Sequence, residues 1–116
     1  MNQYLLILRA DPSVFHQMSP QQMQQTFAKY RDWRVRLAEA GRVTAGHKLE
    51  DTTGRVLRAG GEAAEMRITD GPFAESKELI GGFFILSAET YEGAVELCRD
   101  CPHLEFGAIE VRRVEV

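Results

Sequence analysis

The run that decides the fold is LIGGFFIL, at Leu79–Leu86. Successive side chains of a β-strand point to opposite faces of a sheet, so Phe83–Leu86 would place apolar groups on both faces. A continuous apolar run of this kind is typical of a buried, central strand. The Gly81-Gly82 pair predicts a bulge or the close approach of another backbone, since no helix follows it to form a phosphate-binding loop. The run therefore predicts a central strand in a sheet that is covered on both faces.

One helix is predicted on each side of this strand in the sequence. Before it, Ser19 and Gln22 can form a capping box, Pro20 suits the first helical position and Gly41 can end the helix in a left-handed cap. Residues 20–40 therefore predict one long amphipathic helix. After the strand, Ser87 is expected to cap a second helix that ends at Cys101-Pro102, with an apolar stripe formed by Ala88, Tyr91, Val95 and Cys98.

The order of elements then predicts the architecture. Further strands are expected at Tyr4–Leu8, Val43–Leu49, Arg55–Arg58, Ala64–Asp70 and Ala108–Val116. This order predicts an α+β fold of the ferredoxin-like βαββαβ type with an inserted hairpin and both helices on one face of an antiparallel sheet. The other face would stay bare. Because the central strand is apolar there too, we expect a homodimer that packs sheet face against sheet face.

Length and composition narrow the class of protein. With 116 residues, 44% hydrophobic and 27% charged, the chain predicts one globular domain over residues 1–116. The net charge is −3 and no basic run occurs, which disfavours nucleic-acid binding. The N-terminal apolar run, Tyr4–Leu8, is too short for a signal peptide, and no segment approaches the roughly 20 residues of a membrane helix. We expect a cytoplasmic protein with reduced cysteines and no membrane partner.

The polar segment at residues 70–78 is the most unusual stretch and a candidate site. Its first residue, Asp70, continues the alternating face of Ala64, Met66 and Ile68, so its carboxylate is expected to point toward the core. A buried carboxylate needs a partner or a shifted pKa, which is one way in which a functional acid is made. The alternative is a solvated connector between two strands.

His47 presents a similar choice. It alternates with Val43, Ala45 and Leu49 on one strand face, which is the usual position of a satisfied core histidine. An inward His47 could also meet an inward Asp70. A His–carboxylate pair fixes the tautomer of the imidazole and makes a general base. The catalytic hypothesis assigns proton transfer to this pair.

Two other groups of residues favour structural roles. Cys98 and Cys101 lie at a helix C-terminus, where thiol pKa values are not lowered, and no second cluster completes a zinc site, so structural thiols and no metal are expected. Tyr30, Trp33 and Arg34 could line a pocket under the sheet. Ordinary packing of the helix on the sheet is the stronger interpretation of these three residues.

The segment DGPFAESKE at 70–78, followed by LIGGFF at 79–84, resembles the DGPF-containing branch of the YCII-related family. Similar features are the opening Tyr4–Ile7 strand, the Met23–Tyr30 helix, the Ala40–Val43 junction, Cys101-Pro102 and Ile109–Arg112. The resemblance covers essentially the whole chain. It implies a ferredoxin-like subunit of a dimeric α/β barrel with a cavity under the sheet. The family has no assigned reaction, although a His–Asp pair has been suggested in shorter relatives.

The resemblance also sets the functional alternatives. The first is a small-molecule enzyme without a cofactor, in which Asp70 or His47 moves a proton, Lys77 holds an anionic group, Phe73 forms a wall, and Glu75 and Tyr30 complete the substrate site. The second is a non-catalytic ligand-binding or regulatory protein, since members of this branch often accompany sigma factors. In the third, Asp70, Glu75 and Lys77 only brace the loop and the dimer. This chain has Ala45-Gly46-His47 where the branch commonly has Gly-Gly-Glu. Because of this difference, the resemblance does not carry a family-wide mechanism over to this chain.

Overall fold

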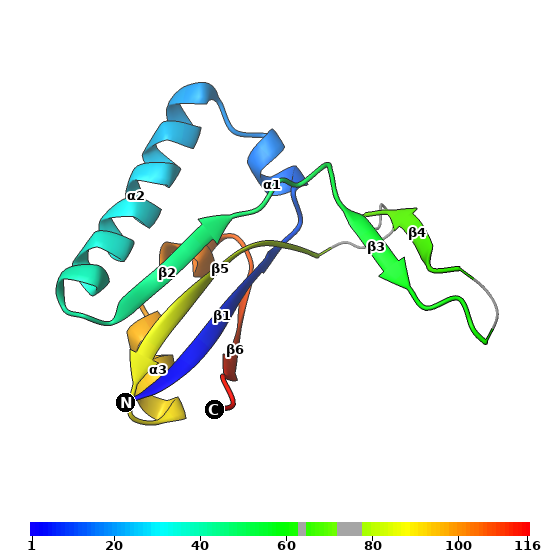
Figure 1. Cartoon of the computed structure of the whole chain (residues 1–116). Coiled ribbons are helices and arrows are strands. Elements are labelled where there is room, and N and C mark those ends of the chain that lie inside the picture. Colours follow the sequence, from blue (N-terminus) through cyan, green and yellow to red (C-terminus); the bar gives the residue numbers. More distant parts are fainter. Residues whose placement is uncertain (63–64, 72–77) are drawn as a thin grey trace.

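The computed structural model describes residues 1–62, 65–71 and 78–116. Four antiparallel strands form the main sheet in the order β2-β5-β1-β6, and a second sheet consists of β3 and β4 (Figure 1). The elements are β1 (Asn2–Ala10), α1 (Ser13–His16), α2 (Pro20–Glu39), β2 (Val43–Lys48), β3 (Arg55–Arg58), β4 (Arg67–Asp70), β5 (Leu79–Ala88), α3 (Tyr91–Cys98), the 3₁₀ turn η1 (Pro102–Glu105) and β6 (Ala108–Arg113). The predicted ferredoxin-like α+β fold, with its hairpin between β2 and β5, is confirmed.

Alternation along the two central strands gives the sheet one covered face. Leu6 and Leu8 of β1 and Phe84 and Leu86 of β5 are buried in one cluster. The same cluster contains Trp33 and Leu37 of α2 and Cys98 of α3, so both helices lie on this face. The residues between them along the strands point to the opposite face, which none of the described helices covers. β5, which contains Phe83, is therefore a central strand of the sheet, as predicted.

The predicted ends of α2 are confirmed. Ser19 and Gln22 form a complete capping box, and Gly41 follows the helix with a φ of 74°. The start of α3 differs from the prediction, because β5 continues to Ala88, which pairs with Asn2. Thr90 caps α3 instead of Ser87, and its hydroxyl accepts a hydrogen bond from the Gly93 amide at 3.0 Å.

The apolar stripe predicted for α3 is half wrong. Ala94 and Cys98 are buried, whereas Tyr91 and Val95 are 44% and 43% exposed. Ala94 and Cys98, four residues apart, define the buried face of α3, and Val95 lies about 100° around the helix from Ala94, at the edge of that face. The short helix α1 was not predicted.

The predicted face of β2 is also wrong, because a bulge interrupts the alternation. The register with β5 shifts between Val43 and Ala45. Val43 and Gly46 are buried on the helix side, while Ala45 pairs with Ile85 and His47 pairs with Phe83 on the open side. One extra residue in a strand moves every later side chain to the other face. His47 therefore does not share a face with Val43.

The hairpin β3–β4 extends away from the main sheet (Figure 1). Its strands pair with each other, and all four residues of β4 are exposed. The Cα radius of gyration is 16.6 Å, whereas a compact domain of this length has roughly 13 Å. We call residues 55–70 the arm. The alternating pattern at Met66, Ile68 and Asp70 thus lies on an element that has no core beneath it.

A buried histidine joins three elements at one end of the sheet. His103 of η1 is 4% exposed. Its Nε2 lies 2.8 Å from the carbonyl oxygen of Arg9 in β1, and its Nδ1 lies 2.8 Å from the hydroxyl of Tyr30 in α2. Burial lowers the pKa of His103 below its usual value, because a charged imidazole would lose its hydration. The ring is therefore neutral in the folded protein.

Replacing Gly46 by alanine tests the packing of β2 against the core. A Cβ at this position would lie 2.3 Å from the Cδ1 of the buried Phe84 ring, so the ring must move. Overpacking of this kind costs about 1–3 kcal/mol of unfolding free energy, which urea titration would measure. Gly81→Ala is the matched control, because its Cβ would meet only side-chain ends at 3.8 and 3.9 Å. Equal stability of the two variants would contradict the packing shown here.

His103 should make stability depend on pH between 7 and 5. The unfolded chain takes up a proton near the ordinary histidine pKa of about 6.5, while the folded chain resists protonation, so the unfolding free energy falls as the pH falls. The slope is at most about 1.4 kcal/mol per pH unit for one proton. His103→Gln, which keeps an amide donor and acceptor, should flatten this part of the curve. Parallel curves for the two proteins would exclude His103 as the group responsible.

Candidate functional site

A pocket of about 360 Å³ lies between α2 and the main sheet. The α2 wall includes a stripe formed by Met23, Phe27, Tyr30 and Arg34, with Arg31 beside it. Steps of four, three and four residues place these side chains on one face of a helix. The floor comes from β1 and β5, through the buried Leu8 and Phe84. A volume in this range accommodates a small organic molecule.

Tyr30 lines this pocket, as the enzyme hypothesis requires, and its hydroxyl is held by His103, which also lines it. The Arg9 carbonyl can only accept a hydrogen bond, so Nε2 of the neutral His103 carries the proton. Nδ1 is then an acceptor, and Tyr30 donates its hydroxyl hydrogen to it at 2.8 Å. The Tyr30 oxygen keeps its lone pairs for a further partner. Burial raises the pKa of Tyr30 well above its usual value, so it is a neutral phenol.

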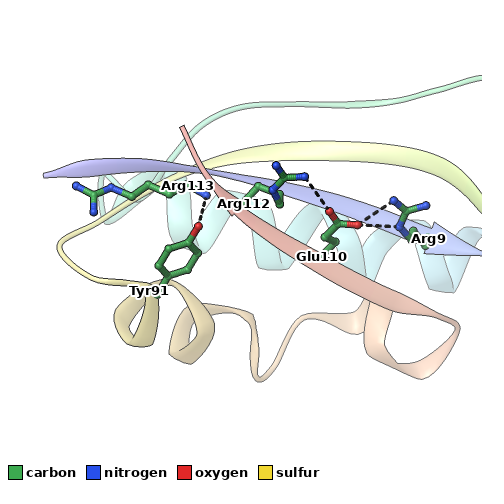
Figure 2. A network of polar contacts seen from close by, with 5 residues as sticks. All are labelled: Arg9, Tyr91, Glu110, Arg112 and Arg113. Carbon is green, nitrogen blue, oxygen red and sulfur yellow. Dashed lines mark hydrogen bonds and ion pairs between the residues drawn. The ribbon is translucent and has the colours of Figure 1, made fainter. Parts of the chain in front are cut away.

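The backbone that accepts this bond is anchored on the other side of the sheet. Figure 2 shows Glu110 between the guanidinium groups of Arg9 and Arg112. Arg9 donates to one oxygen of Glu110 from Nε at 3.2 Å and from Nη2 at 2.8 Å. The hydrogen bond from Arg9 is the main reason why the pKa of Glu110 lies below its usual value. The strand that positions His103 is thus held from both faces.

His103 was missed by the sequence analysis. It lies in a short 3₁₀ turn after Pro102, where hydrophobic periodicity carries no signal. Its burial depends on contacts with α2 and β1, which are distant in the sequence. The folded structure buries His103 and leaves His16 exposed, and this difference separates the two histidines.

His47 is placed differently from the prediction. It borders the pocket at the edge strand β2. By register its side chain lies on the open face, where its ring centroid is 5.9 Å from that of Phe83. It is exposed, so the core position expected for it is wrong.

Asp70 does not point toward the core either. It ends β4 on the arm, its side chain is 92% exposed, and one of its carboxylate oxygens lies 3.4 Å from the Arg55 guanidinium. His47 and Asp70 lie in different sheets, and within the described part of the chain no hydrogen bond or ion pair joins them. Three other predicted site residues, Phe73, Glu75 and Lys77, lie outside the described residues.

Of the other residues singled out in the sequence, one lines the pocket and the others are buried in the core. Arg34 lines the pocket, but Trp33 is buried in the core and its indole N–H donates to Asp100 at 3.2 Å. Cys98 and Cys101 are free and buried, and burial raises their pKa values to about 12 and about 11. Both are therefore thiols rather than reactive thiolates.

The described residues lack two further features that would point to a function. They contain no cluster of three or more His, Cys, Asp or Glu side chains suited to a metal ion. None of the helices found there is both long and apolar enough to cross a membrane.

Comparisons with known proteins agree with this architecture. An uncharacterized protein of Rhizobium meliloti (strain 1021) is 29% identical over 112 residues, which are 94% of this chain and 89% of that protein. Among solved structures, 5-chloro-2-hydroxyhydroquinone dehydrochlorinase from Burkholderia phenoliruptrix AC1100, in complex with 2,5-dihydroxybenzoquinone, has the same fold. Its TM-score is 0.53 at 18% identity, over 97% of this chain and 93% of that one. The YCII-related domain matches residues 2–116, and the chain therefore belongs to the YCII-related family.

Proposed function

We propose that this protein is a small-molecule enzyme that transfers protons in the pocket between α2 and the sheet, without a bound cofactor. The observation that carries the proposal is the Tyr30–His103 hydrogen bond at the wall of an otherwise largely apolar pocket. An oriented acid–base pair in a pocket of ligand size is the usual form of a proton-transfer site. The dehydrochlorinase of the same fold supports small-molecule chemistry as the class, and no more than the class.

The pair can work as a relay. A substrate hydroxyl or acidic C–H would donate its proton to the Tyr30 oxygen while Tyr30 passes its own proton to Nδ1 of His103. The electron pair of the broken bond stays on the substrate, and the resulting imidazolium keeps its Nε2–H bond to the Arg9 carbonyl. Reversal of these steps returns the proton to the product. General acid–base catalysis of this kind contributes about 10²–10⁴-fold to a rate.

The pair predicted from the sequence, His47 with Asp70, remains a second proposal for the proton-transfer groups. His47 lies on β2 beside the pocket, but its side chain is on the open face of the sheet, and Asp70 lies on the exposed arm. Phe73, Glu75 and Lys77 remain proposed substrate contacts. Specific ligand binding without proton transfer would instead favour the regulatory alternative.

We further propose that the working form is a homodimer joined through the open sheet face. Two cross-strand pairs, Leu5–Ile85 and Ile7–Phe83, place four apolar side chains side by side on that face. They are only partly buried in the single chain. A contiguous apolar patch on a soluble domain is usually covered by another protein surface, and a second copy offers the same patch in return.

Tyr30→Phe tests the relay, because it removes the hydroxyl and keeps the aromatic packing. Hydrogen–deuterium exchange into small carbon acids in D₂O, followed by NMR over a panel of hydroxylated aromatics and β-keto acids, should identify a substrate of the wild type. We expect Tyr30→Phe to lose about 10²-fold or more of that exchange rate. His47→Gln should change it less. If His47→Gln abolishes exchange and Tyr30→Phe does not, the Tyr30–His103 relay is wrong and His47 is the base.

Ile7→Asp tests the dimer. An aspartate in the centre of the apolar patch would be buried without a partner, so the variant should sediment at the monomer mass. Val35→Asp is the control, since Val35 is 46% exposed on α2 and lies on the helix side. A wild-type chain that sediments as a monomer, or an Ile7→Asp variant that stays dimeric, would rule out this interface.

A further inference from the structure

The charge of the pocket is opposite to that of the chain. Three cationic side chains line it, Arg31, Arg34 and Lys48, against one carboxylate, Asp51, so its formal charge is +2 among the described lining residues. The whole chain carries −3. Positive charge gathered in one hollow of an acidic protein attracts anions to that hollow.

Among the described residues, one of these three cations has no counter-ion. Lys48 lies 2.9 Å from the Asp51 carboxylate, and the Arg31 guanidinium lies 3.8 Å from Asp32. The Arg34 guanidinium has no hydrogen bond or ion pair with any described residue. It stands one helical turn after Tyr30 on the pocket stripe of α2. A guanidinium in this position is a ready partner for a planar carboxylate.

The other residues of the α2 stripe favour a ligand with an apolar body. Phe27 is 53% exposed although it lines the pocket, and Met23 extends the same wall. Opposite them, Leu8 and Phe84 present a floor without hydrogen-bonding groups. An aromatic body would cover Phe27, and Tyr30, whose hydrogen is used by His103, could accept a hydrogen bond from a ligand hydroxyl.

From this arrangement we infer that the pocket binds hydroxylated aromatic carboxylates, with the carboxylate on Arg34, the ring between Phe27 and the sheet, and the hydroxyl at Tyr30. The inference rests on the proposed function and names its substrate class. It assigns Arg34 a binding role that is separate from proton transfer.

The test compares two probes that differ in charge, 4-hydroxybenzoate and 4-hydroxybenzyl alcohol, by NMR titration of the labelled protein. We expect the carboxylate to bind more tightly and to shift the resonances of pocket residues. Arg34→Gln should weaken its binding about tenfold, as expected for one charge-assisted hydrogen bond, and should leave the alcohol unaffected. Arg36→Gln is the matched control, because Arg36 lies on the same helix, pairs with Asp100 and does not line this pocket.

Other outcomes overturn the inference in distinguishable ways. Equal affinity for the two probes, or equal loss in the Arg34 and Arg36 variants, would show that no specific carboxylate site exists at Arg34. Failure of both probes to bind would reject hydroxylated aromatics of this size as the class. Neither result decides the proton relay, because the exchange assay with Tyr30→Phe measures it on a broader panel of carbon acids.

Discussion

The alternation of side chains along β1 and β5 is the constraint on which the rest of the structure depends. Leu6 and Leu86 are fully buried on the helix side, and that burial fixes the register of the two central strands. Their intervening neighbours must then face the other way, whether or not anything covers them. The helices, the pocket and the bare apolar face all follow from this one alignment, because a shift by one residue would exchange the two faces.

The orientation of the two polar groups in the pocket, Tyr30 and His103, follows from a second, more local requirement. A buried carbonyl needs a hydrogen-bond donor, and for Arg9 the donor is His103. Meeting that need fixes the imidazole tautomer, and the tautomer in turn fixes the direction of the Tyr30 hydroxyl. A bond that completes the backbone of β1 therefore also orients the polar group at the pocket wall. The two ring nitrogens of His103 thus serve the backbone of β1 and the pocket wall at the same time.

The sequence predicted the elements well where local chemistry decides them, as in α2 with its capping box and Gly41. It predicted their faces poorly where long-range pairing decides. The bulge in β2 turned His47 to the open side, and no residue pattern marks it in advance. Asp70 follows an apolar alternation that normally indicates a core, yet among the described strands β4 pairs with β3 alone. His103 became visible only when α2 and β1 met around it. The Tyr30–His103 pair thus depends on contacts between segments that are distant in the sequence, and hydrophobic periodicity does not encode such contacts.

The arm has a consequence for how this chain can diverge. It leaves the main sheet after β2 and returns before β5, two strands that are direct neighbours, so its length does not affect the register of the sheet. Loop closure penalises added residues only slowly. Insertions and deletions in the arm should therefore be far better tolerated than equal changes at the tight junction between α2 and β2. Related chains are expected to differ most in length at this excursion, where a new surface can be acquired without rebuilding the core.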